Sequence, residues 1–416
     1  MGNSHSVQRK QPKNAASQPF QDMDPDYQKS YRLLSGLVKE RKNRQLLAKL
    51  EGEEAQHMAN FLNRVLERRD LPENDTRKEI LHTLTSLART ALVFPECLKL
   101  EGVSCDFNPL IHAGDLGDIY KGDFGDQVVC VKAIRQTPTV HTHEQLLKAS
   151  PNVRSRHTVL IFFQTHVKEA ILSAHMSHKN ILPFYGVHLC SVGYHKVCII
   201  SPWMEHGDLL QYLKDVPDAP RIPLMSDMIS GLAYMHKLSI VHSDLKAKNV
   251  LVSEEGRALL ADFGGSRVNT ATKTGVSVGA ANWMAPELLS GGQRSATTKS
   301  DIWSFACTCY EYTNIIALTK AIDKDGLTPN QPVACPHFDN TVWKKMEECW
   351  AKEPKERPAA VSIGHFFAGL FKDDRVENGH RRLSIRLDRT VVDDALVHQT
   401  LLKVQKTPST GEKKMR

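Results

Sequence analysis

The feature that most constrains this chain is an ordered set of polar residues between short apolar runs in its second half. Asp244, Lys246 and Asn249 lie within residues 240–252, which begin with Ile-Val and end with Val-Leu-Val, and Asp262 follows ten residues later. Phosphoryl transfer needs a carboxylate that positions the acceptor hydroxyl, a lysine near the migrating charge, and oxygen ligands for Mg²⁺. These four residues supply that set, so the pattern indicates phosphoryl-transfer chemistry.

A glycine-containing turn lies upstream of this set. Gly114 and Gly117 fall within residues 111–120, and the apolar run 128–132 that follows ends at Lys132. Glycine lets the backbone come close to phosphate oxygens, so this hairpin is suited to binding a nucleotide, with Lys132 pointing at it. Alone the turn is a weak indication, because glycine turns and strand lysines are common surface features. Its weight comes from its joint occurrence with the downstream set.

The combined pattern resembles the signature set of the eukaryotic protein kinases. Asp262 begins an Asp-Phe-Gly triplet, and residues 284–287 read Met-Ala-Pro-Glu. The resemblance is to the tyrosine-kinase-like group and, within it, to the expanded kinase family of mushroom-forming fungi, and it covers residues 98–371. It implies an α+β, two-lobed protein kinase-like fold, in which a small β-rich N-lobe and a larger helical C-lobe bind Mg-ATP between them.

The resemblance also implies the catalytic and metal-binding roles. Asp244 would orient the incoming hydroxyl, Lys246 would stabilise charge on the transferred phosphate, and Asn249, a catalytic residue too, would hold Mg²⁺ together with Asp262. A lysine at position 246 is the pattern of serine/threonine kinases. The expected activity is therefore transfer of the γ-phosphate of ATP to Ser or Thr of a protein substrate in intracellular signalling.

The ATP-binding residues are implied in the same way. Lys132, oriented by Glu169 from a helix, would hold the α- and β-phosphates, while Met204 takes the hinge position that reads adenine and Asp208 meets the ribose side. The complete predicted ATP-binding set is Gly114, Gly117, Cys130, Lys132, Glu169, Met204, Asp208 and Leu251. The expected cofactors are ATP and Mg²⁺.

Several positions depart from the family pattern. His112 replaces the first glycine of the loop, and Ser243 replaces the arginine that usually precedes the catalytic aspartate, which removes the customary partner of an activation-loop phosphate. Ala280 stands where a threonine is common, and the stretch between Phe305 and Trp343 is short. These departures leave a second interpretation open: a pseudokinase that binds nucleotide or partners as a scaffold without efficient phosphotransfer.

Composition and periodicity divide the chain into four parts. Residues 1–24 are predicted to be a disordered tail, 25–97 a helical segment, 98–371 the kinase domain and 372–416 a basic mobile tail. The helical segment is interpreted either as a brace packed on the next domain or as a docking or regulatory module. Residues 150–164 fit neither a helix nor a loop of known purpose and are predicted to be a poorly packed insertion.

Charge and cysteine usage bear on the cellular context. Much of the net charge of +7 lies near the ends: residues 1–50 carry ten Lys/Arg against four Asp/Glu, and residues 371–416 carry eleven against seven. That distribution favours solvated tails over a nucleic-acid groove, so no nucleic-acid partner is expected. Nine scattered cysteines without a CxxC pair indicate a cytoplasmic protein. The start Met-Gly-Asn-Ser-His-Ser matches the pattern for myristoylation of Gly2, which with nearby basic residues predicts association with a membrane surface.

Overall fold

The computed structural model describes residues 24–68, 75–113, 117–133, 164, 166–190, 196–269, 282–289, 295–313, 331, 339–375 and 392–407. Several sequence predictions fall outside this part of the chain: those for Gly2, Gly114 and Ala280, and nearly all of the predicted insertion. No helix of the described part combines the length and the apolar composition needed to cross a bilayer.

The chain begins with a bundle of helices, as the periodicity of residues 25–97 predicts. These helices are α1 (Pro25–Leu37), α2 (Arg41–Leu47), α3 (Gly52–Leu66) and α4 (Asp75–Ala91). The α3 helix buries Ala55, Met58, Leu62 and Val65, which recur at helical spacing. A 3-10 turn, η2 (Glu96–Leu98), leads from the bundle into the first sheet.

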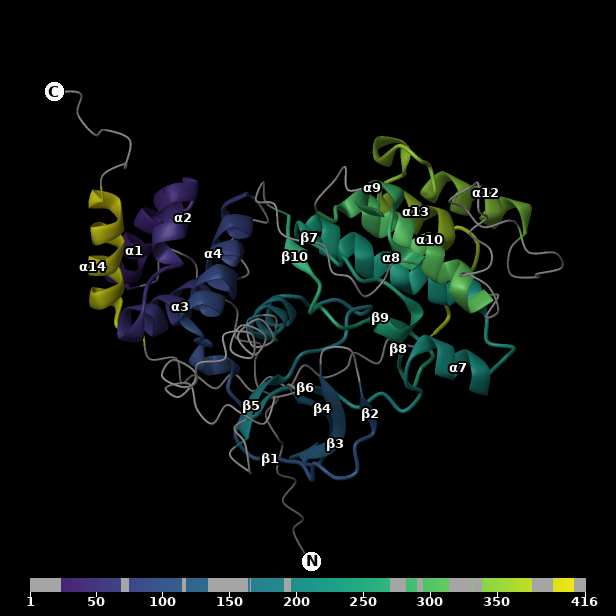
Figure 1. Cartoon of the computed structure of the whole chain (residues 1–416), viewed down its shortest axis with the longest axis horizontal. Coiled ribbons are helices and arrows are strands. Elements are labelled where there is room, and N and C mark those ends of the chain that lie inside the picture. The colour runs from purple at the N-terminus through teal and green to yellow at the C-terminus, as the bar shows by residue number, and fades with distance from the viewer. Residues whose placement is uncertain are drawn as a thin grey trace, which may run out of the picture.

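The N-lobe is built on an antiparallel sheet of six strands (Figure 1). The strand order is β1-β3-β4-β6-β5, and β2 pairs with the N-terminal end of β3, beyond the part that β1 covers. In β4 the alternating residues Val129, Val131 and Ala133 are buried, as expected when one face of an antiparallel strand packs on a core. The strands are β1 (Val103–Ser104), β2 (His112–Ala113), β3 (Asp118–Phe124), β4 (Gln127–Ala133), β5 (Gly186–Cys190) and β6 (Lys196–Pro202). The helical residues 166–174 lie between β4 and β5 in the sequence.

The C-lobe is mainly helical. Its helices are α7 (Leu209–Asp215), α8 (Arg221–Lys237), α9 (Pro286–Leu289), α10 (Thr298–Thr313), α12 (Asn340–Cys349) and α13 (Ala360–Ala368), with the 3-10 turns η3 (Ala247–Asn249) and η5 (Pro354–Glu356). Two small sheets support the loops of the site: β7 (Ile240–Val241) pairs with β10 (Arg267–Val268), and β8 (Val250–Val252) pairs with β9 (Ala258–Leu260). Helix α8 packs against both α13 and β9, and the two-lobed α+β fold is confirmed.

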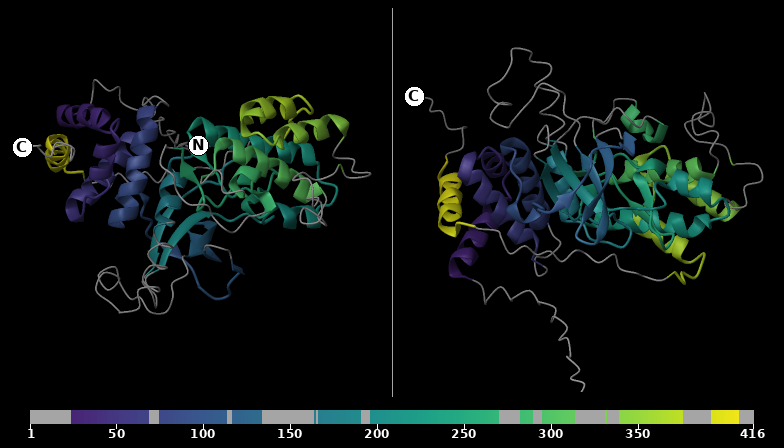
Figure 2. Two further views of the ribbon diagram at one scale, coloured as in Figure 1. Left: turned by 45° about the horizontal axis from the view of Figure 1, so that its top comes forward. Right: turned by 90° about the horizontal axis from the view of Figure 1, so that it is seen from below.

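The predicted mobile tail over residues 372–416 is wrong for its central part, which forms α14 (Asp394–Lys406). This helix lies beside α1 and packs on α2 and α3 as well (Figures 1 and 2). Val397, Leu401 and Val404 form a narrow buried stripe at helical spacing, and Lys403 pairs with Glu54 at 2.5 Å. The stripe was missed because charged neighbours on both sides lower the average hydrophobicity of the segment.

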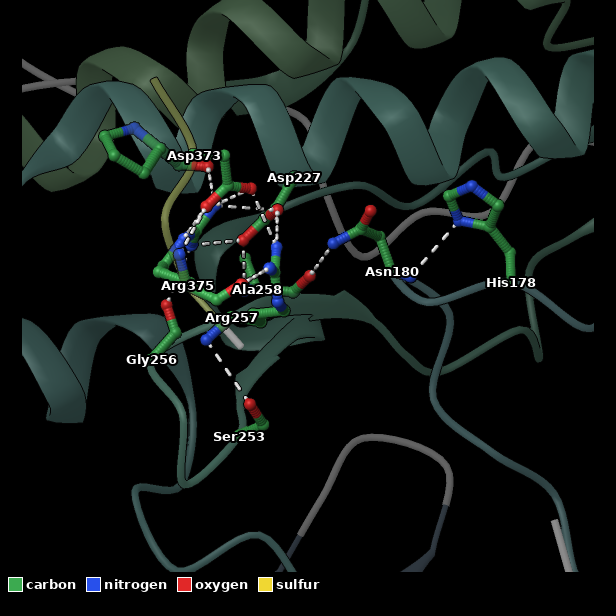
Figure 3. Close-up of polar contacts among 10 residues, drawn as sticks. His178, Asn180, Asp227, Ser253, Gly256, Arg257, Ala258, Asp373 and Arg375 are labelled. Carbon is green, nitrogen blue, oxygen red and sulfur yellow. Dashed lines mark hydrogen bonds and ion pairs between the residues drawn. The ribbon is translucent and has the colours of Figure 1, made fainter. Parts of the chain in front are cut away.

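The chain is also anchored immediately after α13, inside the same predicted tail (Figure 3). The guanidinium of Arg375 donates to both carboxylate oxygens of Asp227 on α8, at 2.7 and 3.1 Å. Arg257, in the turn before β9, donates to Asp373 at 3.0 Å. Since the Asp227 side chain is only 4% exposed, these arginines compensate a carboxylate that has lost its water. The described chain is thus tied to the C-lobe up to residue 375.

Candidate active site

A lysine between two carboxylates forms the first half of the site. Lys132 of β4 donates from Nζ to Oε1 of Glu169 at 2.8 Å and to Oδ1 of Asp262 at 2.9 Å. Burial alone lowers the pKa of Lys132, but the carboxylates of Asp262 and Glu169 outweigh burial and raise it above the usual lysine value. Burial likewise raises the pKa of Asp262, and the Lys132 ammonium outweighs it, so that this pKa is lowered. A strand, a helix and the segment after β9 therefore meet at one charged centre.

The loop between β7 and β8 forms the second half of the site. Asn249 donates from Nδ2 to the Asp244 carboxylate at 2.9 Å and to the Asp244 backbone carbonyl at 2.7 Å. Lys246 Nζ lies 3.3 Å from Oδ2 of the same carboxylate. The three residues predicted as catalytic are therefore in direct contact, and the Asp244 carboxylate is held by two neighbours of its own loop.

A backbone hydrogen bond and a close approach at a glycine join the two halves. Ala261 donates its N–H to the Asn249 carbonyl at 2.9 Å, which places Asp262 next to Asn249. A side chain at Gly265 would bring its Cβ to 3.3 Å from the Cβ of Asp244, so the Asp-Phe-Gly turn lies against the catalytic loop. Both Asp262, at φ 57°, and Ser243, at φ 69°, have left-handed backbone conformations. Strained geometry of this kind persists only where surrounding contacts impose it.

The donor set beside Asp262 fits a hard divalent cation. Because Asn249 uses its amide nitrogen on Asp244, its Oδ1 is the amide atom left for a metal. Asp262 adds carboxylate oxygens, only one of which bonds Lys132. One carboxylate and one amide oxygen, completed by phosphate oxygens and water, suit a cation of the magnesium type. The described residues contain no group of three or more His, Cys, Asp or Glu side chains that could hold a metal by themselves.

The predicted adenine and ribose residues lie along β4, β6 and the start of α7. Cys130 is paired across the strands with Ser201, and burial raises the pKa of its thiol to about 11, so it acts as a small neutral group. Met204 is buried just after β6. Asp208 caps α7, where its Oδ1 accepts the N–H groups of Leu210 and Gln211 at 2.9 and 3.0 Å. One oxygen of the residue predicted for the ribose side is thus used by the helix.

Two further predicted residues are placed by packing. Leu251, the middle residue of β8, pairs with Asp208 through a backbone bridge. A Cβ at Gly117 would lie 2.8 Å from the carbonyl oxygen of Ala133, so only glycine lets β3 approach β4 at this point. Gly117 is therefore required by the sheet itself, independently of any phosphate.

Sequence reasoning assigned no site role to Asp301, which supports the catalytic loop from α10. Its carboxylate is 1% exposed and accepts the backbone N–H groups of His242 at 2.8 Å and Ser243 at 2.9 Å. It also bonds Nε2 of His236 at 2.9 Å. An aspartate at the head of the apolar helix sequence Asp-Ile-Trp-Ser-Phe was the available signal, because a buried carboxylate requires donors.

A buried ion pair lies at the end of the C-lobe. Arg357 and Glu287 form a two-pronged pair, with both N···O distances 2.7 Å. The guanidinium is almost fully buried and also donates to the Ala351 and Lys299 carbonyls. This geometry fixes the segment after the Met-Ala-Pro-Glu motif to the base of the C-lobe.

A two-lobed fold with a lysine–glutamate pair in the β-rich lobe and an aspartate–lysine–asparagine loop in the helical lobe defines the protein kinase class. The profile of the family described as protein tyrosine and serine/threonine kinase matches residues 106–367. The chain belongs to this family, and the predicted resemblance to eukaryotic protein kinases is confirmed.

The relatives include kinases of both specificities. The chain is 28% identical over 265 residues to the serine/threonine/tyrosine-protein kinase HT1 of Arabidopsis thaliana, covering 59% of this chain and 61% of that protein. It is 27% identical over 248 residues to the mouse tyrosine-protein kinase ABL2, covering 56% and 20%, and 26% identical over 268 residues to the Arabidopsis serine/threonine-protein kinase STY46, covering 61% and 42%. The chain thus spans less than two thirds of each of these relatives.

Proposed function

We propose that this protein transfers the γ-phosphate of Mg-ATP to serine or threonine of a protein substrate in cytoplasmic signalling. The observation that carries the proposal is the simultaneous contact of Lys132 with Glu169 and Asp262, at 2.8 and 2.9 Å. These contacts and the loop of Asp244 support the proposal, because phosphoryl transfer relies on polar groups that neighbouring residues hold in place.

Each residue has a distinct task in this proposal. Lys132 donates to the α- and β-phosphates, and Asp262 with Asn249 holds Mg²⁺, which neutralises phosphate charge when bound. Asp244 orients the substrate hydroxyl and accepts its proton, and Lys246 stabilises the charge of the transferred group. The Asn249 amide and the Lys246 ammonium hold the Asp244 carboxylate, so little reorganisation is needed when the hydroxyl arrives.

Serine/threonine specificity is the finer part of the proposal. It rests on Lys246, which follows Asp244 by two residues in the pattern of serine/threonine kinases. Relatives named for tyrosine and for dual specificity make phosphotyrosine formation the natural comparison. Phosphoamino-acid analysis of a mixed peptide library tests this part: phosphoserine and phosphothreonine are expected, and predominant phosphotyrosine would contradict it.

The competing interpretation is a pseudokinase scaffold, which the departures at His112 and Ser243 favour. Two variants separate the interpretations. Asp262→Asn is expected to abolish magnesium-dependent nucleotide binding and turnover together, because it removes a charged metal ligand. Asp244→Asn is expected to bind nucleotide nearly normally while turnover falls about a hundredfold or more, since its group acts mainly in the transition state.

The measurements are radiolabelled ATP turnover with a generic basic protein substrate and nucleotide affinity by calorimetry. Wild-type protein that binds ATP but turns it over no faster than Asp244→Asn on several substrates would contradict the kinase proposal and favour the scaffold.

Membrane association through Gly2 is a separate proposal, supported by the motif at residues 1–6 and by Arg9, Lys10 and Lys13. Intact mass after expression in a eukaryotic host should show a myristoyl adduct that Gly2→Ala lacks.

A further inference from the structure

A pocket of about 270 Å³ lies where the helical segment meets the kinase domain. At this boundary helix α4 packs on β10, and β10 pairs with β7, the strand that follows α8 (Figure 1). We call the pocket the junction pocket. Helices α3 and α4 and the end of α8 line it with Leu66, Arg77, Lys78, Leu81, Lys237 and Leu238.

The helical segment supplies more than half of this lining. Of the nine described residues that line the junction pocket, five lie between positions 66 and 81, outside the residues 106–367 that match the kinase family. The other four are His175 and residues 237–239 of the kinase domain. The pocket therefore exists only because the helical segment packs on the kinase domain, and none of the predicted nucleotide-binding residues lines it.

The lining of the junction pocket is positively charged. Arg77, Lys78 and Lys237 bring three positive charges, and Asp75 brings one negative charge, which leaves a net charge of +2 with histidine neutral. Glu79, a further acid of α4, already lies 3.0 Å from an arginine of α2. The Lys78 ammonium makes no hydrogen bond or ion pair with any residue that the structure describes. An anion in the pocket would therefore gain charge-assisted hydrogen bonds without displacing a partner of Lys78.

Part of the lining is apolar, and the pocket is small. Leu66 and Leu81 are buried, and Leu238 is half-buried. At about 30 Å³ for each water molecule, the volume corresponds to about nine waters, which is below the usual range for drug-sized ligands. The leucines favour contact with carbon, while the cations require acceptor oxygens. A compact ligand that has both an apolar body and an anionic group satisfies the two parts of the lining together.

We propose that the junction pocket binds a small phosphate monoester with a compact apolar body. A phosphomonoester carries a charge of about −1.5 to −2 near pH 7, which matches the net charge of the lining. Its three acceptor oxygens suit a combination of one guanidinium and two ammonium groups. A carboxylate carries a single charge and two oxygens, so it is the poorer match.

The bound molecule contacts parts of the chain that lead to both halves of the active site. His175 follows directly after the helical residues 166–174, which carry Glu169. Ser239 precedes β7, the strand that leads into the loop of Asp244, and its carbonyl accepts the N–H of Asn269 at 2.7 Å. A ligand that bridges these residues and α4 ties the helical segment to both halves.

The test is calorimetry on the full chain with phenyl phosphate as the probe. Lys78→Gln should weaken binding at least about tenfold, because it removes a charged donor, whereas Lys78→Arg should retain most of the affinity. Lys49→Gln is the matched control, since Lys49 is an exposed lysine between α2 and α3 that does not line the pocket. Lys237→Gln is a second variant, on the kinase-domain side, and circular dichroism shows whether each variant folds.

Hydrogen exchange locates the probe. Saturating phenyl phosphate should slow amide exchange in α4 and in residues 237–241. Protection confined to the segments of Lys132 and Asp262 would show that the probe binds the active site and would overturn the proposal. Undetectable binding, or unchanged affinity in both the folded Lys78→Gln and the folded Lys237→Gln proteins, would overturn it as well.

Three comparison ligands test the chemical class. Phenyl sulfate has the same ring with one negative charge, and inorganic phosphate has the charge without the ring. Both should bind at least about tenfold more weakly than phenyl phosphate, and equal affinity of either would overturn the assigned class. N-acetyl-phosphotyrosine amide represents a phosphate borne by a protein, and tighter binding of this amide would overturn the assignment to a small molecule. None of these measurements requires turnover of ATP, so their outcome is separate from that of the kinase proposal.

Discussion

At the scale of single residues, the loop that carries Asp244 depends on the buried carboxylate of Asp301 on α10. Asp301 accepts two backbone N–H groups and bonds His236, which together hold Ser243 in its left-handed conformation. Asp244 follows directly, so the direction of its carboxylate is set through the backbone of its neighbour. Asp301 is a positioning residue, since its contacts reach the reacting groups only through this loop.

Asp301→Asn should therefore destabilise the protein and slow turnover. The amide provides one acceptor in place of two, which leaves a buried N–H group unsatisfied at a cost of about 2–3 kcal/mol. Urea unfolding measures the cost, and separate values of kcat and KM for ATP show whether turnover falls while nucleotide binding is spared. The control is Asp218→Asn, at an exposed position. A change in unfolding free energy no larger than that of the control would contradict the assigned role.

Residue identities in the site could be predicted from sequence because phosphoryl transfer demands few residue types in one order. Asp244, Lys246, Asn249 and Asp262 carry charge or amide groups whose order indicates the chemistry, and Lys132 gains weight from its occurrence upstream of them. The support given by Asp301 could not be recognised as readily, because a helical aspartate usually faces water. The second use of Asp208 as a helix cap was also missed, since capping depends on where α7 begins.

At the scale of elements, α4 places a histidine among cations. The pKa of His82 is lowered to about 4 by burial first, and then by the charges of Arg44, Arg89 and Lys78. Its folded pKa lies below its unfolded value of about 6.5, so the unfolded chain binds more protons between these two values. Stability should therefore decrease as pH falls through this window, and rise as pH increases.

Between pH 7 and pH 5.5 the expected loss of unfolding free energy from His82 is about 1 kcal/mol. His82→Gln removes the titrating group, so its unfolding free energy should depend less on pH by that amount. Urea titrations of both proteins at the two pH values give the difference. Parallel pH dependence in wild type and variant would show that His82 titrates normally in the folded chain.

The anchor after α13 provides a second test at this scale. Arg375→Ala removes the stronger partner of the buried Asp227, leaving it Arg257 at 3.5 Å and the Ala258 N–H at 3.1 Å. Breaking a buried pair from one side costs about 3–5 kcal/mol, because a charge remains without compensation. Lys372→Ala is the matched control, since the Lys372–Asp374 pair is largely exposed. Equal unfolding midpoints for the two variants would contradict the buried anchor.

Helices and strands could be predicted where apolar residues recur with one regular spacing over a long segment. Residues 25–97 and the strands leading to Lys132 are examples. The exception is α14, whose buried stripe consists of three apolar residues and Thr400. A stripe this narrow becomes stable only against a partner surface, and the partner lies more than 300 positions away in the chain. The periodicity of a local segment cannot predict packing between segments so far apart in the sequence.

At the scale of the whole molecule, α14 joins the two ends of the described chain. Leu401→Ala should cost about 2–5 kcal/mol, the usual range for removing a fully buried leucine. Lys403→Ala, at a side chain that is 67% exposed, should cost less than about 0.5 kcal/mol. Hydrogen exchange locates the effect: amides of α1 and α3 should lose protection in Leu401→Ala. Faster exchange confined to the C-lobe would show that α14 does not support the bundle.

The pairing of α14 with α1 has a consequence for how the chain is made. Helices α1 to α4 leave the ribosome before the kinase domain, whereas helix α14, which packs on α1, is translated after it. Until that point is translated, the inner side of the first helix stays open while the entire catalytic domain folds behind it. A product that stops before α14 would expose apolar side chains of α1, which chaperones and proteases recognise. The helical bundle is thus complete only in molecules whose synthesis has passed the kinase domain.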